Sequence, residues 1–432
     1  DYSLLQFNQS DEIMSKDAHS TYNYTFLKLN TDLHFFDNLF LYTDSISQRR
    51  LSSYRNLNFA DINFEGVPMY SGFDGNYNFN FINPTLLGEI FQNQYAKSIH
   101  FNQIKKVQDT LATVIELFSG TKNSKFDIKH IGSSKHFFWE VNPIFENSSG
   151  YSYSNKNTKN PFDLIKISNS GYQNISVFSK AGYSNDEAEI SLNGYFSNAD
   201  LYVPNRLNEN HTHTHFTDYN LFIGKFNFYD RFSANFIISG NVFYKYAYRN
   251  QLSQYDSLDA VITSTLLNLS EYIYGTNFSI EFPTFFEQNT ELTLYYAQGV
   301  DINYDLKDRF NKRLEDENLI FTFFQNLYKS EKLITNFEFQ YFQRNINHSE
   351  LGNLPKNKRG WNLYLNNYYK LSEIDALTLQ LEKFSNPPFN SQYFAVNPAQ
   401  LANLDLKQDN NYLIDLQYDR KITDNFAGNI AL

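Results

Sequence analysis

The sequence contains no cysteine, and it has no apolar run near the roughly 18 to 20 residues that a membrane-spanning helix needs. The absence of cysteine suits a cell envelope, where free thiols are oxidised, although many cytosolic proteins also lack it. The missing apolar run argues against a helical membrane protein. If this chain crosses a membrane, it does so with strands, which carry apolar side chains only at alternate positions.

Positive charge is also scarce. Lys and Arg number 36 against 47 Asp and Glu, so the formal net charge is -11 and the pI is near 5.3. A nucleic-acid-binding protein needs a basic face, and this balance argues against that class. No signal peptide opens the chain, because polar sequence follows Asp1. We interpret Asp1 as a mature or trimmed N-terminus.

Enzyme motifs are missing as well. The chain has no Walker loop, no GxGxxG, no GxSxG and no HExxH, which are the patterns that place phosphate-binding backbone, a nucleophile or a metal. Two acidic pairs, 186–187 and 316–317, stand where turns are expected, and solvated turn residues explain them better than general acid–base catalysis does. The sequence therefore predicts a protein that is not an enzyme.

Aromatic residues are abundant, with 33 Tyr and 42 Phe, yet the mean hydropathy is -0.52. A transmembrane barrel reconciles the two, because each strand turns one set of side chains to lipid and the other to a wet lumen. Aromatic rings also collect at both membrane interfaces. The fold class predicted here is all-β, a transmembrane antiparallel β-barrel of the bacterial outer membrane. The soluble alternatives are a β-propeller or a repeated β-sandwich.

Period-two alternation of apolar and polar residues supports strands in four windows, 236–248, 333–344, 377–382 and 412–419. The apolar set predicted to face lipid is Leu333, Phe337, Phe339, Leu377, Leu379, Leu381, Ile414 and Leu416. The polar set predicted to face the lumen is Asn336, Glu338, Gln340, Thr378, Gln380 and Gln417. A slip of one residue would exchange the two sets, so the pattern also predicts the register.

The connections alternate in length. Short polar turns are expected at 184–186 and 329–331, whereas longer polar loops are expected at 150–171, 201–217 and 251–264. Short turns on one rim and long loops on the other are typical of outer-membrane barrels. From Leu111 onward the pattern predicts roughly sixteen strands of about nine to eleven residues each.

Two regions are therefore predicted: an N-terminal region, 1–110, that is either a plug remnant or the first barrel strands, and a barrel, 111–432. Within the first region, 61–66 and 76–82 look like strands, while 83–94 (NPTLLGEIFQNQ) could begin a short helix.

Three histidines, His211, His213 and His215, are two residues apart. On an extended strand their imidazoles share one face and can offer nitrogen ligands to Zn, Cu or haem iron. Glu209 and Asp218 are close enough in sequence to orient them. The alternative is an external loop whose neutral histidines simply face water. The metal or haem would be a transported ligand, and the sequence indicates no certain cofactor.

Two late segments, 386–393 and 403–412, carry a family resemblance. Their pattern resembles late strands of the TonB-dependent outer-membrane receptor barrel, in which an Asn-Pro-x-Leu-x-Pro-Glu stretch precedes a strand that begins with Tyr. The matching residues are Asn403, Leu406 and Tyr412; Leu404 and Gln408 replace prolines, and Asp409 replaces the glutamate. The hairpin expected over 171–204 and the stretch 64–68 (FEGVP) are also similar to that family's early barrel and plug.

Departures from the family accompany these matches. The plug's Ile-Glu-Arg-Ile-Glu-Val run is missing after Asn83-Pro84, and no TonB box stands near the N-terminus. The family's barrels have roughly 22 strands, so the chain is either a truncated receptor or a smaller barrel that resembles one. A weaker resemblance links it to porins of Bacteroidota.

The resemblance implies outer-membrane transport of a scarce bulky nutrient, such as an iron chelate, haem, cobalamin or a glycan. The implied partners are outer-membrane lipid, a small-molecule substrate and a TonB-type energy-coupling protein, with no nucleic acid. The alternatives are a passive porin for small hydrophilic solutes and a structural or secretion-accessory barrel.

Overall fold

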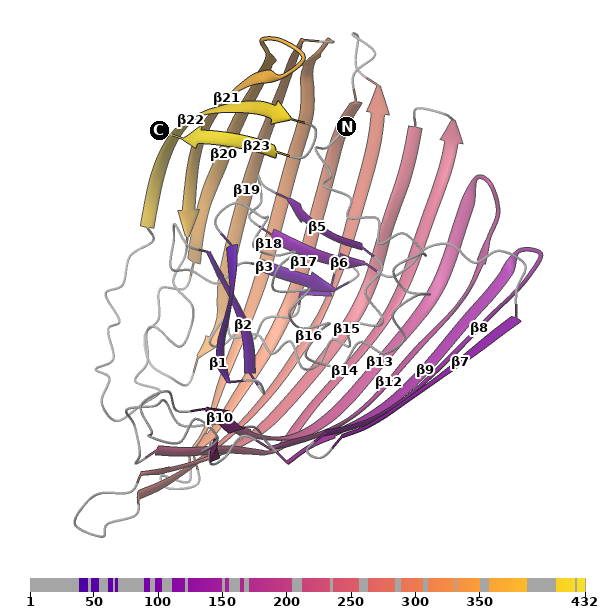
Figure 1. Ribbon diagram of the computed structural model, residues 1–432, viewed down its shortest axis with the longest axis vertical. Coiled ribbons are helices and arrows are strands. Elements are labelled where there is room, and N and C mark those ends of the chain that lie inside the picture. Colours follow the sequence, from indigo (N-terminus) through magenta and orange to yellow (C-terminus); the bar gives the residue numbers. More distant parts are fainter. Residues whose placement is uncertain are drawn as a thin grey trace.

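A computed structural model covers the chain, and Figure 1 shows its arrangement. The structure describes residues 39–45, 48–53, 61–64, 67–68, 89–93, 98–102, 111–120, 123–149, 152–154, 164–166, 171–203, 212–233, 236–255, 263–283, 289–305, 310–330, 332–349, 357–386, 409–423 and 426–431. Every regular element among these residues is a strand. None of the described residues belongs to a helix long and apolar enough to cross a membrane.

One sheet dominates the fold. Its fifteen strands follow the order β23-β22-β21-β20-β19-β18-β17-β16-β15-β14-β13-β12-β9-β8-β7. Their bounds are β7 (Leu111–Ser119), β8 (Asn123–Ser134), β9 (Phe137–Ser148), β12 (Tyr172–Ser184), β13 (Ala188–Val203), β14 (Thr212–Ser233), β15 (Phe236–Tyr255), β16 (Thr263–Pro283), β17 (Asn289–Asp305), β18 (Phe310–Lys329), β19 (Leu333–Ser349), β20 (Asn357–Lys370), β21 (Asp375–Asn386), β22 (Asp409–Thr423) and β23 (Phe426–Ala431). Each strand pairs antiparallel with its neighbours. The result is a meander that bends into a curved wall in Figure 1.

The smaller sheets are short. Their strands are β1 (Leu39–Ser45), β2 (Gln48–Ser53), β3 (Asp61–Phe64), β4 (Val67–Pro68), β5 (Glu89–Asn93), β6 (Ser98–Asn102), β10 (Ser152–Ser154) and β11 (Leu164–Lys166). Strands β3 to β6 form a mixed sheet in which β3 and β6 run parallel. The short helix considered for 83–94 is wrong for 89–93, which pairs with β6 as a strand, and the rest of that range lies outside the described residues. The strand predicted at 61–66 is confirmed for 61–64, and 76–82 lies outside the described residues.

Short connections share one rim of the large sheet. They join β8–β9, β12–β13, β14–β15, β16–β17, β18–β19, β20–β21 and β22–β23. Asn185 shows why such turns form, since its side-chain oxygen accepts hydrogen bonds from the backbone N–H groups of Glu187 (2.9 Å) and Ala188 (2.6 Å). Ser330 accepts from Lys332 and Leu333 in the same way. The turn predicted at 184–186 is confirmed, and the turn predicted at 329–331 is confirmed for the described residues Lys329 and Ser330.

The opposite rim carries longer strands than the sequence predicts. Strands β14, β15 and β16 have 22, 20 and 21 residues, whereas crossing a membrane takes about nine to eleven. Residues 212–217 and 251–255, expected in loops, belong to β14 and β15 and pair with each other. Backbone hydrogen bonds hold a ladder together whether or not its side chains are apolar, so the hairpins continue past the apolar segment.

The two faces of the large sheet differ as the alternation predicts. On β19 the predicted lumen residues Asn336 and Glu338 are each only 4% exposed, and on β22 the predicted lipid residue Ile414 is 72% exposed. Cross-strand pairing places apolar residues opposite apolar ones and polar residues opposite polar ones. Leu379 lies opposite Leu416, and Gln380 lies opposite Asp415. We call the face with buried polar side chains the inner face and the other the outer face.

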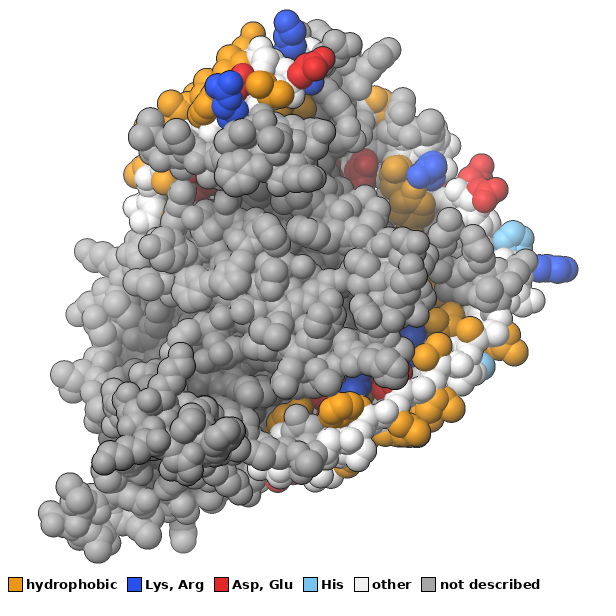
Figure 2. Space-filling model, viewed as in Figure 1, with side chains coloured by type: hydrophobic (Ala, Val, Ile, Leu, Met, Phe, Trp, Pro, Cys, Tyr) orange, Lys and Arg blue, Asp and Glu red, His pale blue; other side chains and the backbone are white. Residues whose placement is uncertain are grey.

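Large apolar side chains stand exposed on the outer face along the whole wall. They include Ile190, Leu192, Phe196, Phe222, Phe226, Val242, Tyr244, Tyr274, Leu294, Phe321, Trp361 and Ile414. In Figure 2 orange side chains follow the lower right margin, where Figure 1 places β7 to β9. So continuous an apolar surface is not stable in water and is the surface that lipid covers. The described pairings run from β7 to β23 and include none between those two end strands.

The chain's two tryptophans mark the two edges of this apolar surface. Trp139 lies at the start of β9, beside the short-turn rim, and its indole ring covers Gly132, where an added Cβ would come within 2.1 Å of the ring. Trp361 lies at the other end of the wall, near the start of β20, and Lys383 Nζ stands 3.8 Å from its ring centroid. Indole rings prefer the interface between hydrocarbon and headgroups.

We therefore expect both rings to be quenched more by nitroxide lipids labelled near the headgroup than by lipids labelled near the bilayer centre. The variants Trp139→Phe and Trp361→Phe each leave a single emitter, so fluorescence of the folded chain in vesicles assigns a depth to each ring. Stronger quenching of either ring from the bilayer centre would show that the apolar surface is placed wrongly in the membrane.

Candidate functional site: the polar inner face

Polar side chains are buried at alternate positions along the inner face. They come from most strands of the wall: Asp127, Asn142, Glu146, Asn174, Ser176, Ser191, Asn193, Ser197, Lys225, Asn241, Lys245, Arg249, Glu271, Asn336, Glu338, Arg344 and Lys358. Burying a charge is costly unless it is paired, so this face needs a network of partners. It is the part of the described wall on which a solute can meet fixed charges and hydrogen-bonding groups.

Strands β8 and β9 carry the first group of charges. Lys125 Nζ lies 3.1 Å from Asp127 Oδ2, and the Asn142 amide donates to Asp127 Oδ1 at 2.7 Å. One step along the same strands, Lys129 and Glu140 form a second ion pair at 3.3 Å. The register brings these residues together, because β8 and β9 are neighbouring antiparallel strands whose inner-face positions face the same side.

Strands β15 and β16 hold the most deeply buried ion pair. Lys245 Nζ lies 2.9 Å from Glu271 Oε1, and both side chains are almost wholly inaccessible to solvent, at 1% and 2%. The two residues sit diagonally across the ladder, since Glu271 lies opposite Ala247. Attraction between charges is strong where water is excluded, and each charge depends on the other for compensation.

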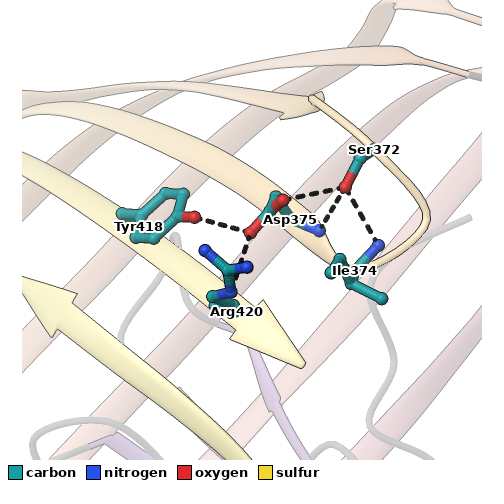
Figure 3. A network of polar contacts seen from close by, with 5 residues as sticks. All are labelled: Ser372, Ile374, Asp375, Tyr418 and Arg420. Atoms are coloured by element: carbon teal, nitrogen blue, oxygen red, sulfur yellow. Dashed lines mark hydrogen bonds and ion pairs between the residues drawn. The ribbon is translucent and has the colours of Figure 1, made fainter. Parts of the chain in front are cut away.

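A separate polar network braces the short-turn rim on the outer side (Figure 3). The Tyr418 hydroxyl donates to Asp375 Oδ1 at 2.5 Å, the Ser372 hydroxyl donates to Asp375 Oδ2 at 2.9 Å, and Arg420 Nε lies 3.8 Å from Asp375. These hydrogen bonds, with a smaller contribution from Arg420, lower the pKa of the Asp375 carboxyl. Ser372 also accepts from the backbone N–H of Ile374. The network ties the β20–β21 turn to β22 and is structural.

The predicted metal-binding histidines lie near the long-connection rim. His213 and His215 lie near the start of β14, opposite Gln254 and Leu252 of β15. His211 lies outside the described residues. In the part of the chain that the structure describes, no group of three or more His, Cys, Asp or Glu side chains is placed to hold a metal ion. The metal site on His211, His213 and His215 stays a prediction.

Sequence reasoning found one half of the buried ion pair and missed the other. The alternation of apolar residues in β15 places Lys245 and Arg249 on the opposite face, away from lipid. Glu271 went unnoticed because it is an isolated charge, with Ser270 before it and Tyr272 after it. The signal that identifies it is cross-strand: a lone carboxylate at an inner-face position, one step diagonal from a lysine on the preceding strand.

Comparisons with known proteins support the fold. No protein-family model matches the sequence, and no curated protein matches it. Solved structures do. The copper transporter OprC matches with a TM-score of 0.70 at 10% identity, over 93% of this chain and 70% of its own. The hemophore receptor HasR of Serratia marcescens, solved with its hemophore HasA and heme, matches with 0.67 at 10% identity, over 90% and 66%.

FpvA of P. aeruginosa, solved with heterologous pyoverdines, matches with a TM-score of 0.66 at 8% identity. The match covers 90% of this chain and 58% of that one, so the chain spans little more than half the length of FpvA. These proteins are TonB-dependent receptors. The all-β outer-membrane fold and the predicted structural resemblance are therefore confirmed, and the three matched proteins named here are transporters or receptors.

Proposed function

We propose that this chain forms the wall of an outer-membrane transporter of the TonB-dependent receptor type, which takes up a scarce bulky nutrient such as an iron chelate, haem, cobalamin or a glycan. The observation that supports this most is the inner face, where charges such as those of Lys245 and Glu271 are buried as well as paired. In an open water-filled pore such side chains would be solvated. Burial of many polar side chains on one face is what a filled lumen produces.

In this function the N-terminal region, 1–110, would fill the lumen as a plug-like segment, and residues 111–432 would form the barrel. In support, the mixed sheet β3–β6 precedes the meander in sequence and shares no strand with it. Its β3–β4 hairpin carries the FEGVP stretch that resembles the plug, and Val67 within it is completely buried. A filled lumen requires an energy-coupling partner of the TonB type, which would displace the plug during transport.

Conductance separates this function from a passive porin. The purified chain in a planar bilayer is expected to give no steady current, and uptake of its substrate by cells should depend on the inner-membrane energy source. A large steady single-channel conductance would favour the porin and overturn the receptor proposal. Absence of both conductance and energy-dependent uptake would leave a structural or secretion-accessory barrel as the better account.

We further propose that His211, His213 and His215 contact a metal or a metal-bearing ligand at the outer rim. Their two-residue spacing supports this, as does the position of His213 and His215 on a strand. Imidazole ligates metal only when neutral, so binding of Zn, Cu or haem should weaken as pH falls below about 6.5.

Replacing all three histidines by Ala should abolish that binding in titration calorimetry while the far-UV circular dichroism spectrum stays that of a β-protein. Replacement of His130 and His136, which lie on β8 and at the β8–β9 turn, is the matched control and should leave binding unchanged. Equal binding by the triple variant and the parent would show that these are ordinary solvated histidines.

A further inference from the structure

The outer face changes from apolar to polar at one level across four neighbouring strands. Toward the long-connection rim, the run of apolar outer positions on each strand ends with one amphipathic side chain: Tyr341 on β19, Trp361 on β20, Lys383 on β21 and Tyr412 on β22. Cross-strand pairing aligns them, because Tyr341 lies opposite Trp361 and Lys383 lies opposite Tyr412. Residues with an apolar body and a polar tip lie where hydrocarbon meets lipid headgroups. This level is therefore the edge of the hydrocarbon on that side of the wall.

Two cations stand at this level, on the neighbouring strands β20 and β21. Arg359 is exposed and lies two residues before Trp361, so both side chains are on the outer face. Lys383 continues the outer face of β21 after Leu379 and Leu381. No described outer-face position of β19 to β22 at this level carries a carboxylate, and neither cation forms an ion pair within the described part of the chain. This stretch of the membrane face is therefore positively charged.

The Lys383 ammonium is held in a fixed position by neutral groups. Its Nζ lies 3.8 Å from the centroid of the Trp361 ring and donates to the backbone oxygen of Trp361 and to Ser385 Oγ, the latter at 2.6 Å. Ser385 Oγ in turn donates to Asn410 Oδ1 at 2.7 Å. An ammonium has three N–H groups, so these acceptors leave one for a further partner. The side chain is only 9% exposed, and a charge largely withdrawn from water is costly unless an opposite charge compensates it.

We propose that Arg359, Trp361 and Lys383 bind the phosphate group of a membrane lipid. The planar guanidinium of Arg359 can donate to two phosphate oxygens at once, and Lys383 supplies its remaining N–H as a point charge. The indole of Trp361 packs beside them at the depth of the headgroups. Because long connections face the outside of the cell in outer-membrane barrels, the lipid belongs to the outer leaflet. The inference adds a lipid partner and is independent of what the protein transports.

The test uses the full chain with Trp139→Phe, which leaves Trp361 as the single tryptophan. The folded protein in phosphatidylcholine vesicles is given increasing mole fractions of diphosphoryl lipid A, and the emission of Trp361 is followed. We expect a change that saturates. Arg359→Gln should raise the mole fraction at half-saturation about tenfold, because a charge-assisted hydrogen bond is lost. Arg359 is exposed, so the far-UV circular dichroism spectrum should not change.

Lys370→Gln is the matched control, because Lys370 is an exposed cation at the other end of the same strand, beside the short-turn rim. It should leave the lipid titration unchanged. Lipid A without phosphate groups should give no saturating change, and inorganic phosphate should not compete with the phosphorylated lipid. The proposal is wrong if the dephosphorylated lipid binds as well, if Lys370→Gln weakens binding as much as Arg359→Gln, or if inorganic phosphate alone reproduces the change in emission.

Discussion

Replacing Lys245 by Met is expected to destabilise the chain by about 3 to 5 kcal/mol, which is the cost of leaving one charge of a buried pair uncompensated. Lys245 and Glu271 are 2.9 Å apart with almost no solvent contact. Glu271→Leu should have an effect of similar size. The measurement is equilibrium unfolding by guanidinium in lipid vesicles, followed by tryptophan fluorescence.

The double variant Lys245→Met with Glu271→Leu measures how much of each loss comes from the interaction between the two charges. Because it removes both charges and restores apolar contact, it should recover most of the lost stability. Lys129→Met breaks the Lys129–Glu140 pair, whose side chains retain 17% and 12% exposure, and should cost less. Strictly additive losses in the double variant would show that the two charges do not compensate each other.

The second large effect concerns the membrane face of β21. Leu379→Arg should cost roughly 2 to 4 kcal/mol if the residue lies near the bilayer midplane, because the guanidinium has to leave water for hydrocarbon. Leu379 lies on the outer face between Leu377 and Leu381, and Leu416 is its partner on β22. The assay is unfolding in vesicles under conditions in which the parent refolds reversibly.

Gln380→Arg is the control one position along the same strand. It places the same side chain on the inner face, opposite the buried carboxylate of Asp415, and should cost little or nothing. A similar loss for both variants would show that the register of β21 is wrong by one residue, since a slip of one exchanges the faces.

Much of the wall is predictable from sequence because alternation is a local property. Successive side chains of a strand point to opposite faces, so apolar residues at every second position indicate a membrane strand and its orientation. This reasoning assigned Asn336 and Glu338 to the inner face and Ile414 to the outer face, as the structure has them. Turns at residues such as Asn185 and Ser330 were equally predictable, because their side chains accept hydrogen bonds from backbone N–H groups only two or three residues away.

The ends of the strands and the structure of 83–94 were harder to predict from the sequence. Beyond the membrane the apolar alternation stops while backbone pairing continues, so β14 and β15 extend through residues expected in loops. In 83–94 the alternation did not decide and a short helix was considered, yet 89–93 pairs with β6. Pairing with a partner strand overrides a weak local preference, and a single segment does not identify that partner.

By itself, then, the sequence determined the class of fold, the face of each clear strand and the positions of the short turns, since all three follow from residues near one another in the chain. Only the tertiary structure decided which charges meet. Lys245 and Glu271 are 26 positions apart in the chain, yet their side chains form an ion pair. Their proximity depends on the register between β15 and β16, and an ion pair of this kind has no signal within either segment alone.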